Sequence, residues 1–334
     1  MNGKERTIRA LTHDGPDRIP VDIWTLPAAF LVHGDKLSDL ISERDPDIMR
    51  VSHYDPLGDE HLHDKGIHTD IWGTEWHNHQ QGILGEPKKC PLEGLSAAQI
   101  HEYSSPVSLL RAQKDEVITS AKQSVRELSD KFLLSGWCNL FERMQFLRGV
   151  ENLYCDIAEE NEEFFAVRDI AMEFAVEYFS IMSGIEGADG CIIGDDWGSQ
   201  LSLLISPDAW RRLFKPCYKR LIGIIKENGK RVFVHSDGYT LAIYEDWIEL
   251  GVDAINSQVW CMGLDKVAEA TRGRITLWGE LDRQNALPHG SPDRLLEMIG
   301  EMKSHFWNRG GLIGEFEAGG DVPFENVRAA AFGW

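Results

Sequence analysis

The sequence has 334 residues, of which 43% are hydrophobic and 26% charged, which is typical of a globular protein with a large core. Disordered, collagen-like and small disulfide-bonded proteins are therefore excluded. Lys and Arg number 34 against 54 Asp and Glu, and the resulting net charge of −20 disfavours nucleic acid or an anionic membrane surface as a partner. No apolar run is long enough for a membrane span, and the start lacks the apolar core of a signal peptide, so we expect a cytoplasmic protein.

Eight short apolar or β-branched runs predict strands, and from about residue 130 they alternate with segments of helical period. A single stripe of Val167, Ile170, Phe174, Tyr178 and Ile181 illustrates that period. Repeated strand–helix units favour a (β/α)8 TIM barrel over residues 1–334 as one domain. The alternative is a doubly wound sheet, but no GxGxxG or P-loop motif follows any strand. The predicted strands are 18–24, 47–55, 131–136, 190–195, 231–236, 252–257, 274–279 and 311–317.

Two helix starts carry the same chemical signal, a serine cap followed by proline, at Ser206-Pro207 and at Ser291-Pro292. We expect the first helix to run to Gly229 with a kink at Pro216, and the second to run to Gly310.

A barrel needs about 250 residues, so a surplus remains, and we place it in the poorly periodic stretch 56–106. Within it, 68–82 has the alternation and flanking glycines of a hairpin. We expect this N-terminal insertion to lie over the barrel mouth. Its histidines are irregularly spaced, which is typical of a solvated loop. The six cysteines contain no CxxC pair, and we expect most of them to be reduced core residues.

Polar residues follow the predicted strands at their C-terminal ends, where TIM barrels place their working groups. In chain order they are His53 and Asp55, Asn139 and Glu142, Asp195 and Asp196, His235 and Asp237, Asn256 and Gln258, Glu280 and Asp282, and Glu315 and Glu317.

His235 and Asp237 are the most specific pair, because residues i and i+2 of a strand point the same way. An imidazole and a carboxylate make half a metal site, and Glu315 or Glu317, at the same spacing on the last strand, could supply a third ligand. The alternative is a structural histidine paired with a carboxylate.

Asp196 and Glu142 are candidates for a catalytic role, in which they would hold substrate or handle a proton, although Asp196 could instead cap the following helix. Aromatic side chains at or near strand ends could wall a pocket, and core packing is the competing explanation; they are Trp72, Trp76, Trp137, Trp197, Trp260 and Trp278. We predict the substrate-binding set to be Trp197, Asn139, Asn256, Gln258, Glu280 and Tyr54.

Several long motifs, in order, resemble the uroporphyrinogen decarboxylase superfamily and, within it, the corrinoid-linked methyltransferase branch. They are RIPVDIW at 18–24, FERMQFLRGVENLYCDI at 141–157, the segment 194–221, VFVHSDG at 232–238, ELGVDAIN at 249–256 and VPFENVRA at 322–329. The resemblance covers nearly the whole chain and implies a TIM barrel, in agreement with the strand pattern.

Zinc methyltransferases of that branch hold the metal through His-x-Cys and a later Cys. Here His235 matches the histidine, Asp237 replaces the first cysteine, and Glu315 and Glu317 stand in the region of the last ligand. A His, Asp and Glu set is harder than thiolates and suits polarising an oxygen. The divalent metal is expected to be Zn²⁺, although other ions are compatible with these ligands.

The resemblance therefore implies a methyltransferase that removes a methyl group from a small methoxy compound, plausibly aromatic, and transfers it to the cobalt of a corrinoid on a partner protein. Tetrapyrrole decarboxylation is the rival reaction, but the Arg-Gln-Ala-Gly-Arg motif of its members is missing. A third possibility is a non-catalytic barrel that binds a ligand or a corrinoid protein. The superfamily often pairs its subunits, so a homodimer is a further possibility.

Overall fold

The computed structural model describes residues 1–53 and 59–334, and it confirms the predicted barrel. Eight parallel strands form one sheet in the order β1-β11-β10-β9-β8-β7-β6-β2. Each contains residues of one of the eight predicted runs. They are β1 (Val21–Thr25), β2 (Ile48–Arg50), β6 (Phe132–Cys138), β7 (Gly190–Gly194), β8 (Arg231–His235), β9 (Ala254–Asn256), β10 (Thr276–Trp278) and β11 (Leu312–Ala318).

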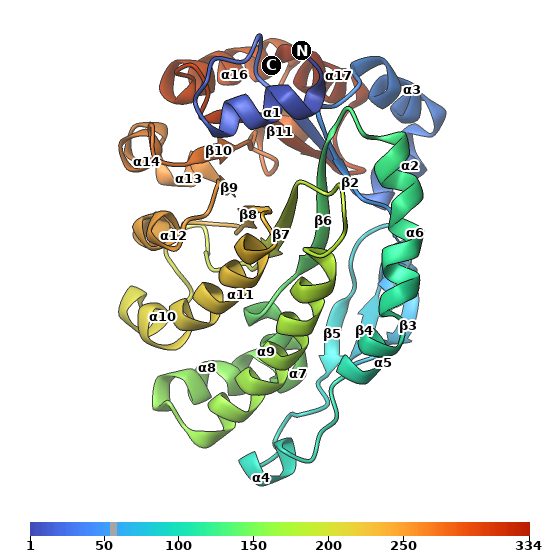
Figure 1. Cartoon of the computed structure of the whole chain (residues 1–334), viewed down its shortest axis with the longest axis vertical. Coiled ribbons are helices and arrows are strands. Elements are labelled where there is room, and N and C mark those ends of the chain that lie inside the picture. The colour runs from blue at the N-terminus through green and yellow to red at the C-terminus, as the bar shows by residue number, and fades with distance from the viewer. Residues whose placement is uncertain (54–58) are drawn as a thin grey trace.

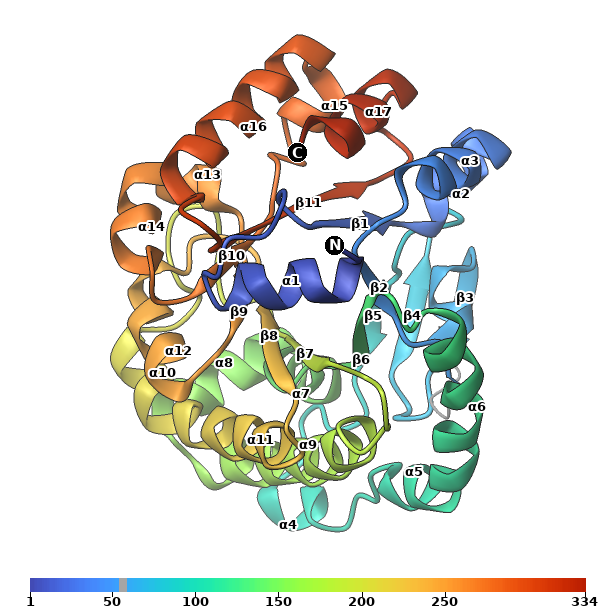
Figure 2. The ribbon, with the colours of Figure 1, turned by 45° about the horizontal axis from the view of Figure 1, so that its top comes forward.

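The first two strands bring the sheet round into a barrel. The amide of Asp47 donates to the carbonyl of Val21 at 2.8 Å and so joins the two ends of the strand order. The helix α1 (Gly3–Leu11) crosses the N-terminal end of the barrel (Figure 2), where Ile8 and Leu11 pack against the apolar residues that fill its interior. The opposite end, where the strands finish, is left for the site.

Helices surround the barrel (Figure 1), and a second, larger apolar cluster lies between them and the strands. The helices after α1 are α2 (Pro27–His33), α3 (Asp35–Arg44), α4 (Ala97–Ile100), α5 (Val107–Ala112), α6 (Lys114–Glu127), α7 (Phe141–Arg148), α8 (Val150–Glu159), α9 (Glu162–Met182), α10 (Pro207–Leu213), α11 (Lys215–Glu227), α12 (Tyr244–Leu250), α13 (Val259–Met262), α14 (Leu264–Thr271), α15 (Ala286–His289), α16 (Pro292–Phe306) and α17 (Phe324–Gly333); short 3-10 turns are η1 (Asp59–His63) and η2 (Leu241–Ile243).

The cap signals are confirmed, since Ser206 and Ser291 each accept a hydrogen bond from the first turn of α10 and α16. The predicted kink at Pro216 is instead a break. α10 ends at Leu213, and Pro216 lies in the first turn of a new helix, α11, where its missing N–H is not needed. The second helix also ends earlier than expected, at Phe306 rather than near Gly310.

The hairpin expected in the stretch 56–106 is present as the antiparallel pair of β3 (Gly66–Thr69) and β4 (Glu75–Asn78), and β5 (Glu86–Lys89) extends it to a three-stranded sheet. Figure 1 shows it at the side of the barrel, beside α6. Asp70 between its strands pairs with Arg143 of α7 at 3.2 Å, which ties the insertion to a helix at the mouth. The single-domain boundaries remain a prediction.

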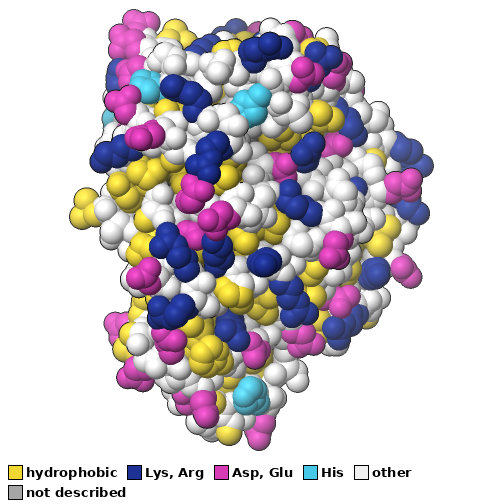
Figure 3. Space-filling view, turned by 60° about the vertical axis from the view of Figure 1, so that its left-hand side comes forward, with side chains coloured by type: hydrophobic (Ala, Val, Ile, Leu, Met, Phe, Trp, Pro, Cys, Tyr) yellow, Lys and Arg dark blue, Asp and Glu magenta, His cyan; other side chains and the backbone are white. Residues whose placement is uncertain are grey.

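Among the described residues, no helix is both long and apolar enough to cross a membrane. The face in Figure 3 carries acidic and basic side chains interspersed, so the net charge of −20 is not gathered there into an area of one sign. All six cysteines are free, and Cys138, Cys191 and Cys217 are buried.

Candidate metal centre at the barrel mouth

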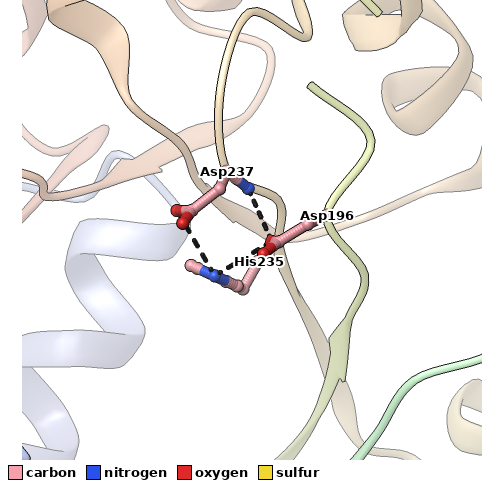
Figure 4. A group of neighbouring side chains, drawn as sticks. All are labelled: Asp196, His235 and Asp237. Carbon is pink, nitrogen blue, oxygen red and sulfur yellow. Dashed lines mark hydrogen bonds and ion pairs between the residues drawn. The ribbon is translucent and has the colours of Figure 1, made fainter. Parts of the chain in front are cut away.

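Three side chains from two neighbouring strands converge at the mouth: His235 at the end of β8, Asp237 two residues later, and Asp196 just after β7 (Figure 4). One potential ligand atom from each lies within 4.8 Å of the others. The imidazole Nε2 is 3.5 Å from Asp196 Oδ1 and 3.6 Å from Asp237 Oδ1. The i and i+2 reasoning therefore placed His235 and Asp237 correctly side by side.

The loops after β7 and β8 pack against each other, and this contact brings Asp196 to the pair. The amide of Asp237 donates to Asp196 Oδ1 at 2.9 Å, and the amide of Gly198 donates to the Asp237 carbonyl at 3.0 Å. A Cβ on Gly238, whose φ is +76°, would lie 2.3 Å from the Gly198 backbone. Only glycine fits this crossing of the two loops.

The hydrogen bond between His235 and Asn256 decides which imidazole nitrogen has a free lone pair for a cation. The imidazole Nδ1 lies 2.6 Å from the Asn256 side-chain oxygen. The Asn256 amide nitrogen donates to the Trp278 carbonyl and to Glu315, so its oxygen is the acceptor facing the ring. Nδ1 therefore carries the proton, and the Nε2 lone pair points toward the two aspartates, as in a metal-ligating histidine.

These residues fit a divalent cation better than a structural ion pair. At 3.5 and 3.6 Å the Nε2–carboxylate distances are too long for good hydrogen bonds. Neighbouring ligand atoms around tetrahedral Zn²⁺ lie about 3.3 Å apart, which is close to these values. Asp237 Oδ1 is buried without a hydrogen-bond partner, and a cation would satisfy it.

We expected Glu315 or Glu317 to lie beside His235 and Asp237, but the third member of the group is Asp196. Neither glutamate belongs to the group of mutually close ligand atoms found among the described residues. β11 is three strands away from β8 around the barrel, whereas β7 is adjacent, so Asp196 is the carboxylate that reaches the pair.

The two glutamates have other partners. Glu315 is buried below the mouth, where one carboxyl oxygen accepts from Asn256 at 3.1 Å and the other has no hydrogen-bond partner. Glu317 accepts from Arg283 at 2.8 Å. Arg283 also bonds to Asp237 Oδ2 and approaches Glu280 at 3.5 Å, so one guanidinium ties together three carboxylates and leaves Asp237 Oδ1 toward His235.

Burial among these acids favours protonated carboxyls. The pKa of Glu142 is raised to about 8 by burial and by the charges of Asp196 and Asp195. The pKa values of Glu280 and Glu315 are raised well above their usual range, first by burial and then by neighbouring carboxylates. The mouth thus combines two aspartates beside His235 with carboxylic acids that can donate a proton.

A cavity of about 370 Å³ is lined by residues of β1 and β2 together with Trp137 and Glu317. Two of its walls are the rings of Trp24 and Trp137, whose centroids lie 5.2 and 5.4 Å from the imidazole. Gly194 makes room for Trp137, because a Cβ there would lie 2.5 Å from the indole. Arg50 of β2 lines the same cavity.

We expected Trp197 to contact the substrate, but the structure places it in the core. It is fully buried, stacks on Phe141 with centroids 3.9 Å apart, and donates to Tyr218 at 2.9 Å. The neighbouring Asp195 is also structural. Its carboxylate accepts from the amides of Leu140 and Glu142 at the start of α7 and from the Tyr218 hydroxyl.

The other predicted substrate residues are divided among different places. Asn256 is fully buried and orients His235, so it is not exposed to a ligand. Gln258 and Glu280 line a second cavity of about 180 Å³, together with Arg283. Asn139 lines a third of about 150 Å³ and bonds to Glu142 at 3.3 Å. Tyr54 lies outside the described residues.

Sequence reasoning missed four residues of the mouth, which are Asp22, Trp24, Arg50 and Arg283. Asp22 and Trp24 have the same i and i+2 spacing on β1 that singled out His235 and Asp237. Applied to every strand, that rule would have found them. Arg283 follows β10 by five residues and had no comparable signal.

The fold and the convergent ligands define a (β/α)8 barrel with a candidate metal centre at its C-terminal mouth. Residues 90–330 match the family model described as Uroporphyrinogen decarboxylase (URO-D), and the chain belongs to this family. A solved methyltransferase from Methanosarcina mazei shares the fold over 100% of this chain and 98% of its own, with a TM-score of 0.71 and 19% identity.

Two other solved structures are similar only in part. A dihydropteroate synthase from Xanthomonas albilineans has 18% identity and a TM-score of 0.33 over 47% of this chain and 57% of its own. An endo-1,4-beta-xylanase from Caldicellulosiruptor owensensis has 13% identity and a TM-score of 0.36 over 64% and 76%. Likeness at this level carries no functional argument. No match was found among curated proteins.

Proposed function

We propose that the protein is a metal-dependent methyltransferase that takes a methyl group from a small methoxy compound, with an aromatic one preferred, and passes it to the cobalt of a corrinoid on a partner protein. One observation carries the proposal: His235 Nε2, Asp237 Oδ1 and Asp196 Oδ1 face one another, with the imidazole proton held on the opposite nitrogen. The likeness to the Methanosarcina methyltransferase supports the choice of reaction class.

The proposed chemistry needs a way to stabilise the leaving oxygen of a methyl ether. A dication held by His235, Asp237 and Asp196 would polarise that oxygen, and its imidazole and carboxylate ligands suit Zn²⁺. The reduced corrinoid would supply the nucleophile, so no nucleophilic side chain is required.

The chain's own residues would bind, shield and protonate the substrate. Trp24 and Trp137 give the methoxy compound an apolar wall beside His235 and exclude water from it. Glu142, protonated near neutral pH, would give its proton to the oxygen left behind when the methyl group departs. Asp237 would stay oriented by Arg283 while its other oxygen serves as a ligand.

The family name points to a second reaction, the decarboxylation of a tetrapyrrole. Its substrate carries many carboxylates, whereas Asp196 and Asp237 contribute two carboxyl groups beside His235, and Arg283 at the mouth is already paired with Asp237 and Glu317. A substrate with many carboxylates would need several unpaired cations, whereas a small methoxy compound needs at most one, and this difference favours methyl transfer over the rival.

Incubation of the zinc-loaded protein with a reduced corrinoid protein and a panel of methoxyaromatics tests the proposal. We expect methylcobalamin absorbance in the wild type and none with His235→Ala. Turnover of uroporphyrinogen without methyl transfer would instead establish the rival reaction. Neither activity, together with undiminished ligand binding in the variant, would identify a non-catalytic barrel.

A further inference from the structure

One positively charged side chain, Arg50, lines the mouth cavity, and its hydrogen bond to Asp22 uses only part of its donor capacity. We propose that Arg50 binds a carboxylate of the substrate, so that the ligand is a methoxy-substituted aromatic acid. The assignment of this ligand as the methyl donor rests on the proposed function, whereas the anion site itself rests only on the geometry around Arg50.

Asp22 and two indoles fix the guanidinium in place. Arg50 Nη2 donates to Asp22 Oδ2 at 2.9 Å, and that buried carboxylate also accepts from the indole nitrogens of Trp24 at 2.9 Å and Trp278 at 3.1 Å. The guanidinium carbon lies 5.6 and 5.5 Å from the same two rings. A stacked, paired arginine is preorganised and loses little freedom when it binds a second anion.

Most of the hydrogen-bonding capacity of Arg50 remains for a ligand. A guanidinium has five N–H donors, and within the described part of the chain Arg50 hydrogen-bonds only to the Asp22 carboxylate, with the second bond long at 3.5 Å. Its side chain is 38% exposed and borders the cavity of about 370 Å³. A carboxylate entering this cavity would find a fixed, fork-shaped donor.

The position of Arg50 relative to His235 sets the shape of the ligand. Trp24 contacts both, with its ring centroid 5.6 Å from the guanidinium carbon and 5.2 Å from the imidazole centroid. A flat ring bound in this cavity would have one edge at Arg50 and its other edge against the two tryptophans that contact the imidazole. A benzoic acid with its methoxy group opposite the carboxylate has this arrangement.

The remaining charges of the cavity tolerate an anion at Arg50. Asp22 and Glu317 also line the cavity, but Asp22 is paired with Arg50 and accepts from two indole N–H groups, and Arg283 pairs with Glu317 at 2.8 Å. The nearest rival anchor is Arg143 in the cavity of about 150 Å³, and this side chain is only 12% exposed and paired with Asp70. Arg143 therefore serves as the matched control.

Tryptophan fluorescence titrations of the metal-free protein, without corrinoid, test the site with 4-methoxybenzoate and uncharged methoxybenzene. We expect the wild type and Arg143→Gln to bind 4-methoxybenzoate about 10- to 100-fold more tightly than methoxybenzene, as for hydrogen bonds to charged groups. Arg50→Gln should abolish the preference while methoxybenzene affinity stays the same.

Arg50→Lys covers the possibility that Arg50→Gln fails to fold, because lysine can still pair with Asp22 but lacks the fork. It should weaken 4-methoxybenzoate binding about 10-fold. A preference that survives both Arg50 variants, or one that disappears in Arg143→Gln, would overturn the inference.

The same variants separate the anion site from the proposed function. If 4-methoxybenzoate binds through Arg50 but is not demethylated, the anion site stands and the proposed function fails. If a methoxyaromatic is demethylated without any preference that depends on Arg50, the proposed function stands and the anion site fails.

Discussion

His235 depends on Asn256, because the amide oxygen holds the proton on Nδ1 and so leaves Nε2 for a cation. Replacing Asn256 with leucine removes that acceptor from a fully buried position. We predict that Asn256→Leu weakens Zn²⁺ binding about 10- to 100-fold, the usual effect of losing the partner of a ligating histidine. Competition with a chromophoric chelator measures this affinity.

Asn256→Asp is the matched control, since a carboxylate also accepts from Nδ1 and should preserve Zn²⁺ affinity. Equal losses in both variants would show that the amide supports packing and does not select the tautomer.

Glu142 makes stability depend on pH, because its pKa in the folded protein is about 8 and its ordinary value is 4.5. A raised pKa means that the folded state binds this proton more tightly than the unfolded state. The stabilisation is therefore complete below pH 4.5 and is lost as the pH rises through 8.

Urea unfolding of the metal-free protein at pH 5 and pH 8 measures the effect. The free energy of unfolding of the wild type should fall relative to that of Glu142→Gln as the pH rises. A constant difference between the two proteins would show that the carboxyl is not held protonated by burial.

Trp197 fills the core between Phe141, Phe214 and Tyr218. We predict that Trp197→Phe lowers the free energy of unfolding. Trp197→Ala should lower it more, by about 3–5 kcal/mol relative to the wild type. The folded Trp197→Phe protein should keep the ligand affinity of the wild type in the same fluorescence titration. A selective loss of ligand binding with unchanged stability would return Trp197 to the substrate pocket.

Among the structural elements, the loops after β7 and β8 position the candidate metal centre, because their contact brings Asp196 to His235 and Asp237. Gly238 has φ +76° and touches Gly198, so an added methyl group must push the loops apart. We predict that Gly238→Ala lowers the free energy of unfolding by about 1–3 kcal/mol and weakens Zn²⁺ binding, because Asp196 then moves away from Asp237. Gly223→Ala is the control, since a Cβ there meets nothing within 4 Å.

Thermal unfolding and chelator competition on the two alanine variants separate these effects. Unchanged Zn²⁺ affinity in Gly238→Ala would contradict the role of the loop contact.

The strands were predictable from the sequence because each is a short apolar run, and the helices because their periods and serine caps are local signals. The break before Pro216 was not, since a proline suits both a kink and a first turn. The i and i+2 rule predicted the contact between His235 and Asp237. It could not predict that Asp196 joins them, because that contact depends on how two loops pack.

At the scale of the whole molecule, the order of strands around the barrel decides which carboxylates meet. His235 and Asp196 follow adjacent strands, whereas Glu315 and Glu317 stand on β11 and pair with Asn256 and Arg283. Composition and motif spacing contain no such distance information, so the carboxylate that lies beside His235 and Asp237 could not be identified from the sequence.

A cation bound only by the folded protein should also stabilise the whole barrel. At a free Zn²⁺ concentration of 100 times the dissociation constant, the gain in the free energy of unfolding is about 2.7 kcal/mol. Calorimetry with and without a chelator measures it. The same melting temperature in both conditions would show that the metal binds no better to the folded chain.

Equilibrium dialysis with Zn²⁺ tests the metal centre most directly. We predict one tightly bound ion per chain in the wild type and in His305→Ala, a control variant of a histidine that pairs with Asp265 on the surface. The ion should be lost in His235→Ala and in Asp237→Ala. Tight binding that persists in both of these variants, or no stoichiometric binding by the wild type, would show that these side chains do not form a metal site.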